Sequence, residues 1–215
     1  MKMSRQNRQL VAYTAKFLGF FAILFYGTEA VIGLSAPGNN YSAFVDRYLD
    51  FITPFRNFLL NASIGLLSLF GVEAGSREDI LFWKGGQALR MSYSCIGYGV
   101  ISFWVAFILA NPGPPKKKAT WILAGAFLLC FINILRVSLL LVAINRGWPI
   151  PFGWDHHTWF NIVCYAVIFG MIYRFDKKTK STGAKAGRGK GPFVQAAGGS
   201  LRQMQNGGKT AKTSL

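Results

Sequence analysis

Residues 119–145 read ATWILAGAFLLCFINILRVSLLLVAIN, an apolar run whose only charged residue is Arg136. An unbroken apolar run of this length predicts a helix that spans a membrane. An arginine within such a run costs about 3 kcal/mol on insertion scales, and it needs a partner or a function to offset that cost. Arg136 is therefore the first candidate for a functional residue.

The composition also indicates a membrane protein. Of the 215 residues, 52% are hydrophobic and 15% are charged, and the mean hydropathy is +0.30; this balance is unusual for a soluble domain. A net charge of +16 would suit nucleic acid, but the basic residues cluster beside the apolar runs, in 1–16, 116–118 and 176–215. Positive charge in those places sets membrane topology, so we expect no nucleic-acid partner.

The apolar runs predict an all-α polytopic membrane protein, a bundle of about four to six transmembrane helices. The clearest runs are 17–34, 92–110, 119–145 and 157–175. A further segment, 57–70, is apolar but marginal in length. An amphipathic interfacial helix, a re-entrant segment and a tilted span all fit it.

The chain divides into a basic segment 1–16, a membrane-embedded domain 17–175 and a basic tail 176–215. The tail is rich in Lys, Gly, Ser, Thr and Gln without apolar periodicity, which predicts disorder. The basic start followed by an apolar run resembles a signal sequence, but no small-residue cleavage site follows, so we expect a retained anchor.

Two turn signals interrupt the membrane-embedded domain. Residues 35–50 contain Pro37-Gly38-Asn39-Asn40, which predicts a loop. Gly85-Gly86 lies between two short apolar runs before the run that begins at residue 92. This pattern predicts a short hairpin outside the membrane.

The lysines at 116–118 and the tail after Phe175 should lie in the cytoplasm by the positive-inside rule. Arg136 then lies seventeen residues outward from Ala119, roughly 25 Å at 1.5 Å per residue. That distance places it near the outer boundary of a hydrocarbon core about 30 Å thick. Cys95 and His157 stand at the outer starts of their own runs, so the three residues should converge at one extracytoplasmic level.

Cys95, Arg136 and His157 together suit acyl transfer. The thiolate is the nucleophile, and a guanidinium favours that form or stabilises a developing oxyanion. A histidine takes the thiol proton and returns it to a leaving amine. The spacing of Cys95, His156 and His157 fits no metal site, and we expect no metal and no cofactor.

The other two cysteines have no predicted chemical role. Cys130 and Cys164 lie mid-membrane without charged neighbours in the sequence, and we assign both to packing.

Arg136 could instead extend its head group to the lipid head groups, and a histidine near an interface can simply cap a helix. Glu29 interrupts the first apolar run, and it either lies near the interface or is a functional acid within the membrane. A non-enzymatic assembly partner of a polysaccharide or secretion system, with Arg136 paired to Glu29, and a small transporter both remain open.

Three motifs, in order, resemble the exosortase/archaeosortase family. Ser94-Cys95-Ile96-Gly97 is similar to its cysteine motif, and Asn133-Ile134-Leu135-Arg136 to its Asn-x-x-Arg motif. His157-Thr158-Trp159-Phe160-Asn161, followed by Tyr165, is similar to its histidine motif. The resemblance covers about residues 50–175. The chain has fewer spans than many members, and of the two adjacent histidines His157 has the family spacing.

The resemblance implies a membrane-embedded cysteine protease or transpeptidase in the inner (cytoplasmic) membrane, multi-pass, with its active site on the extracytoplasmic side. Besides the lipid bilayer, its partners would be membrane-anchored proteins with a C-terminal sorting signal, made of a short motif, a transmembrane helix and a basic cluster. Cleavage would end in hydrolysis or in transfer to a surface acceptor. The implied roles are Cys95 as nucleophile, Arg136 as oxyanion or thiolate stabiliser and His157 as general acid/base.

Overall fold

The computed structural model describes residues 5–36, 40–148 and 156–185, and within them the chain is mostly helical. Its elements, in chain order, are α1 (Arg5–Ser35), α2 (Ala43–Tyr48), α3 (Ile52–Leu69), β1 (Ala74–Arg77), β2 (Ile80–Trp83), β3 (Ala88–Arg90), the 3-10 turn η1 (Tyr93–Ile96), α4 (Tyr98–Ala110), α5 (Pro115–Asn145) and α6 (His156–Lys185).

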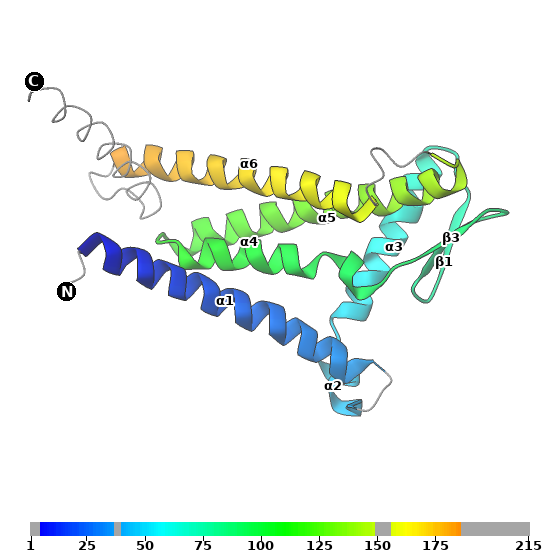
Figure 1. Cartoon of the computed structure of the whole chain (residues 1–215), viewed down its shortest axis with the longest axis horizontal. Helices are drawn as coiled ribbons and strands as arrows, with labels where there is room; N and C mark the ends of the chain where they lie inside the picture. The colour runs from blue at the N-terminus through cyan, green and yellow to red at the C-terminus, as the bar shows by residue number, and fades with distance from the viewer. Residues whose placement is uncertain (1–4, 37–39, 149–155, 186–215) are drawn as a thin grey trace, which may run out of the picture.

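Helices α1, α4, α5 and α6 run along the long axis of the molecule in alternating directions (Figure 1). The start of α1, the turn between α4 and α5, and the end of α6 therefore lie at one end. That end carries the basic clusters at the start of α1, at 116–118 and on the last turns of α6. Helices α1 and α5 are long and apolar enough to cross a membrane, whereas α4 and residues 162–175 of α6 are shorter apolar helices.

The helix ends differ from the predicted boundaries. Helix α1 begins at Arg5, within the segment 1–16 predicted to be a separate basic region. Helix α6 continues to Lys185, so residues 176–185 of the predicted disordered tail are helical; residues 186–215 lie outside the described residues. Polar and basic residues such as Lys and Gln are good helix formers, and for this reason a hydropathy boundary is not a helix boundary.

Residues 35–50, predicted to be a loop, contain the short helix α2. Leu49–Phe51 then separate α2 from α3. The Asp50 carboxylate accepts hydrogen bonds from the backbone N–H groups of Ile52 and Thr53, each at 3.0 Å. An acidic side chain in this position satisfies donors that the first turn of α3 cannot pair internally.

Helix α3 crosses the end of the bundle opposite to the basic clusters, at a steep inclination to the lengthwise helices (Figure 1). It buries Leu59, Leu60, Ser63 and Leu67 and packs against α5. This crosswise course favours the interfacial helix among the three interpretations that the sequence allows, because a spanning helix would run beside its neighbours.

Beyond α3, the chain forms an antiparallel sheet in the order β1-β2-β3. The segment thus has two hairpins, of which β2–β3 contains the Gly85-Gly86 turn. Leu81 at the centre of the register, opposite Ser76 and Leu89, is fully buried. The extracytoplasmic position of this sheet stays a prediction.

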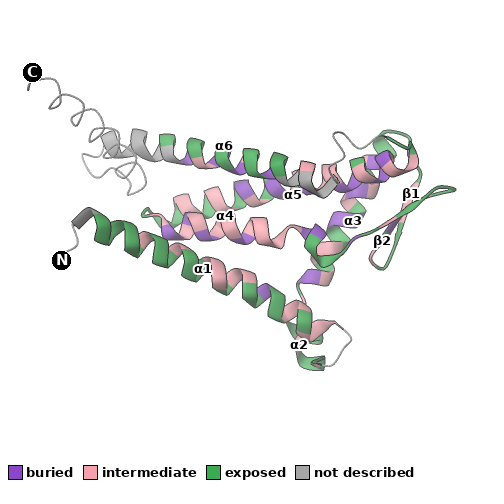
Figure 2. Cartoon of the chain, in the orientation of Figure 1, coloured by how far each residue is buried: buried purple, intermediate pink, exposed green. Residues whose placement is uncertain are grey.

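Two hydrophobic cores follow from this arrangement. The outer core joins α3, the sheet, η1 and the end of α5, with Leu59, Leu81, Cys95 and Leu141 among its members. The inner core joins α4, α5 and α6 around the fully buried Trp104. Much of the surface of α1 and α6 is exposed (Figure 2), and that surface includes large apolar side chains such as Ile23 and Phe169, as contact with lipid requires.

The sheet is fixed to α5 by Asn145, at the C-terminal end of that helix. Its Oδ1 accepts a hydrogen bond from the backbone N–H of Gln87 at 2.6 Å, and its Nδ2 donates to the Gln87 carbonyl at 3.3 Å. The amide thus pairs with Gln87 as a neighbouring strand would. Gly86 permits this approach, since a Cβ there would collide with Asn145 Oδ1.

We predict that Gly86→Ala displaces Asn145 and costs about 1–2 kcal/mol, because it breaks the two exposed hydrogen bonds between Asn145 and Gln87, each of which contributes about 1 kcal/mol or less. The thermal unfolding midpoint of the detergent-solubilised protein should fall by several degrees. Gly85→Asn is the matched control, because Gly85 has φ +77° with no atom near its Cβ position and Asn tolerates that conformation. An equal midpoint for both variants would contradict the role of Asn145 in fixing the sheet to α5.

Candidate functional site

Cys95 lies in η1, the turn that joins the sheet to α4. The residue is 9% exposed and belongs to the outer core. Its Sγ is 3.3 Å from the Ser92 hydroxyl, which is itself 2.9 Å from the Ser94 hydroxyl. A hydroxyl at this distance can donate to a thiolate and stabilise the charge.

Gly97 ends η1 and precedes α4 in a left-handed conformation, φ +82°. Glycine adopts this conformation without steric cost, which explains its place here. The turn at Gly97 places Cys95 three residues before Tyr98, the first residue of α4.

Asn133 of α5 holds this turn in place. Its Nδ2 donates to the carbonyl oxygens of Cys95 and Ile96, each at 3.0 Å. The side chain is almost fully buried, and its Oδ1 has no hydrogen-bond partner among the described residues. The two carbonyls fix the orientation of the amide, because only its nitrogen can donate to them.

Arg136 is half-buried on α5, three residues beyond Asn133, about 4.5 Å further along the helix. Both residues therefore lie on nearly the same face of α5, at the level of η1. Helix α6 approaches α5 at this level, since Asn133 and Cys164 line the same small cavity.

The third predicted site residue, His157, lies at the start of α6, which begins at His156. The side chains of both histidines lie outside the described residues. The structure therefore brings Cys95 and Asn133 into contact and places Arg136 on the next turn. The approach of His157 to them stays a prediction.

A small cavity of about 10 Å³ lies beneath the turn, where α4, α5 and α6 meet. Its lining includes Gly97, Asn133 and two of the three cysteines, Cys130 and Cys164. Among the described residues no group of three or more potential ligands is placed to hold a metal ion.

Helix α1 makes two contacts near the site. Gly99 faces α1, where a Cβ added to this glycine would lie 3.2 Å from the Phe25 ring. The Glu29 carboxylate accepts a hydrogen bond from the Tyr98 hydroxyl. Ion pairs within the described part of the chain are confined to the sheet and its edges, so the pairing of Glu29 with Arg136 is not found there.

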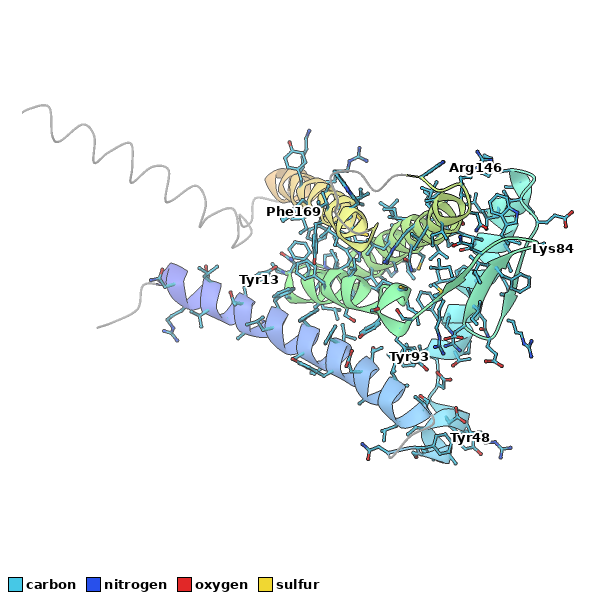
Figure 3. All side chains as sticks on the ribbon, turned by 45° about the vertical axis from the view of Figure 1, so that its right-hand side comes forward. Tyr13, Tyr48, Lys84, Tyr93, Arg146 and Phe169 are labelled. Atoms are coloured by element: carbon cyan, nitrogen blue, oxygen red, sulfur yellow. The ribbon has the colours of Figure 1, made fainter. Side chains whose placement is uncertain are left out.

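A second arginine lies near the turn, and no sequence pattern pointed to it. The guanidinium carbon of Arg56, on α3, lies 5.8 Å from the ring centroid of Tyr93 in η1. Figure 3 shows Tyr93 where the start of α4 meets α3. Arg56 Nε is buried without a hydrogen-bond partner among the described residues. Sequence spacing gives no signal for this contact, because α3 and η1 meet only through the crosswise course of α3.

Of three comparisons with known proteins, one identifies a family. A search of curated proteins and a search of solved structures found no match. The family model described as transmembrane exosortase matches residues 30–174, a range that includes α3, the sheet, η1 with Cys95, Asn133, Arg136 and the first part of α6. This match covers more than half of the chain, and the chain belongs to the transmembrane exosortase family.

Proposed function

We propose that this exosortase is a cysteine peptidase or transpeptidase that cleaves C-terminal sorting signals of exported proteins at the extracytoplasmic face of the inner membrane. The observation that carries the proposal is the pair of hydrogen bonds from Asn133 to the Cys95 and Ile96 carbonyls. These bonds join the cysteine motif to the Asn-x-x-Arg motif in space, although 38 residues separate Cys95 from Asn133.

In the proposed reaction, His157 first takes the proton of the Cys95 thiol. The Cys95 thiolate attacks the scissile carbonyl carbon, and the carbonyl electrons move onto oxygen, where Arg136 stabilises the charge. The tetrahedral intermediate collapses, the C–N bond breaks, and His157 gives a proton to the leaving amine. Water, or an amine or hydroxyl of a surface acceptor, then attacks the thioester and releases Cys95.

Helix register supports His157 over His156 as the acid/base. The buried residues of α6 are Cys164, Ile168, Met171 and Phe175, a stripe with spacings of four, three and four. Position 157 lies seven residues before Cys164 and continues this stripe. Position 156 continues a different face, which includes the half-exposed Val163.

The proposed topology has α1, α4, α5 and α6 crossing the membrane, with α3 in the outer interface. With these four crossings, both the start of α1 and the end of α6 would lie in the cytoplasm with the basic clusters, as the positive-inside rule expects. Helix α4 has 13 residues and spans only about 20 Å of a core about 30 Å thick. Cys95 would thus lie within the outer edge of the membrane, where low dielectric strengthens the effect of Arg136.

We expect Cys95→Ala to abolish processing of a tagged substrate that ends in a sorting signal, with a loss of about 10³-fold or more because the nucleophile is removed. Processing is measured as the change in substrate size on immunoblots, normalised to enzyme abundance in the membrane. Cys130→Ala is the matched control and should process normally. Normal processing by Cys95→Ala would refute the cysteine mechanism and favour a non-enzymatic assembly role.

The two histidines should separate in the same assay. His157→Ala should reduce processing by about 10²–10⁴-fold, the usual contribution of a general acid/base, whereas His156→Ala should stay within a few-fold of wild type. A loss with His156→Ala and not with His157→Ala would reverse the assignment.

Asn133→Asp should lower the rate constant of processing by about 10–100-fold. The variant keeps the side-chain shape but replaces two donated hydrogen bonds, each contributing about 1 kcal/mol, with repulsion between oxygens. A structural role alone would leave Cys95 reactivity unchanged, so the alkylation rate of Cys95 by iodoacetamide is measured in a Cys130→Ala/Cys164→Ala background. Asn145→Asp, on the same helix but at the sheet, should leave that alkylation rate unchanged. An unchanged rate in Asn133→Asp as well would exclude the positioning role.

A further inference from the structure

A groove of about 770 Å³ lies between α5 and α6 at the end opposite to the site. Its α5 wall includes Ala124 and Leu128, and its α6 wall includes Val167, Gly170, Arg174 and Lys177. The small residues Ala124 and Gly170 leave it open. At Gly170 an added Cβ would have no other atom within 4 Å.

The groove has a polar end and an apolar end. Arg174 and Lys177 are three residues apart on α6, so they lie on one face, and both are exposed. The ion pairs of the described residues, Lys84–Glu73 and Arg90–Asp79, involve neither of them. From Arg174 the groove extends along α6 past Gly170 to Val167, about 10 Å of apolar wall at 1.5 Å per residue.

We propose that this groove binds one anionic phospholipid of the cytoplasmic leaflet. The phosphate would lie between Arg174 and Lys177, and an acyl chain would follow the small-residue wall toward Leu128 and Val167. Charge complementarity selects an anionic head group over a zwitterionic one, and basic pockets between transmembrane helices on the cytoplasmic side are known to hold such head groups. The site needs the proposed topology but none of the proposed chemistry.

The edge of the groove is suited to the same occupant. Trp121 packs edge-on against Phe175, with ring centroids 5.4 Å apart, next to the basic pair. Trp121 lines the groove, and tryptophan is enriched at the level of lipid head groups. The lysines at 116–118 begin α5 at the same end of the molecule and add to the positive potential there.

The test uses the full chain purified in a neutral detergent, with native mass spectrometry of bound lipid. Phosphatidylglycerol and phosphatidylcholine of equal chain length are offered at equal concentration. Wild type should retain one phosphatidylglycerol in preference to phosphatidylcholine. Arg174→Gln/Lys177→Gln should weaken that retention about thirtyfold, since each basic residue near the membrane surface contributes roughly a factor of five. Gly170→Leu, which keeps the charge but fills the acyl groove, should weaken it as well.

Matched controls separate the groove from general effects. Arg77→Gln/Arg146→Gln removes the same charge at the sheet end, and Gly19→Leu places the same side chain at an open position on α1; both should bind as wild type does. Equal retention by wild type and the double variant at 174 and 177, or displacement of the lipid by excess inorganic phosphate, would overturn the proposal. Normal binding by Gly170→Leu would also overturn it, because the acyl chain would then lie elsewhere. Substrate processing is measured separately from lipid binding. A protein that binds the lipid but does not process substrate would contradict only the proposed function.

Discussion

The hydrogen bonds from Asn133 to the Cys95 and Ile96 carbonyls are the constraint on which the site depends. A 3-10 turn leaves its last carbonyls unpaired, and a buried carbonyl without a partner is costly. One amide on α5 satisfies two of them and thereby fixes the turn relative to that helix. Because Arg136 lies one turn further along the same helix, the bonds that stabilise the turn also set the position of the arginine relative to the thiol.

The crosswise helix α3 makes this arrangement possible at the end of a bundle. Lengthwise helices bury one another along their sides but leave their ends open. Helix α3 and the fully buried Leu81 of the sheet cover the end of α5, and Asn145 fixes the sheet to that helix. Cys95 thus belongs to the outer core and is shielded from solvent. The inner core around Trp104 packs α4 and α6 against α5. It thereby sets the positions along α5 at which η1 ends and α6 begins.

Much of the fold was predictable from the apolar runs, because lipid and the core both select apolar side chains over a length set by the membrane. The lengthwise course of α1, α4, α5 and α6 follows from those runs. The helix ends were not predictable in this way: hydropathy does not register the helical preference of Lys and Gln in α1 and α6, and the left-handed Gly97 divides a continuous apolar run into η1 and α4. In the site, Asn133 could be read as a motif residue, but its role depends on the distance between two helices. The contact between Arg56 and Tyr93 depends on packing in the same way.

The energetic problem posed by Arg136 has a structural answer in two parts. Depth reduces the cost, since the residue lies toward the C-terminal end of a helix of 31 residues and the penalty for a charge falls near either interface. Its half-buried position on α5 reduces the cost further, because part of the side chain lies against protein and not against lipid. In the proposed reaction, a charge that is in place before the oxyanion forms needs little reorganisation, and electrostatic stabilisation is strongest where the dipoles and charges are already in place. The residue that is most costly to insert would then be the one that lowers the barrier of that reaction.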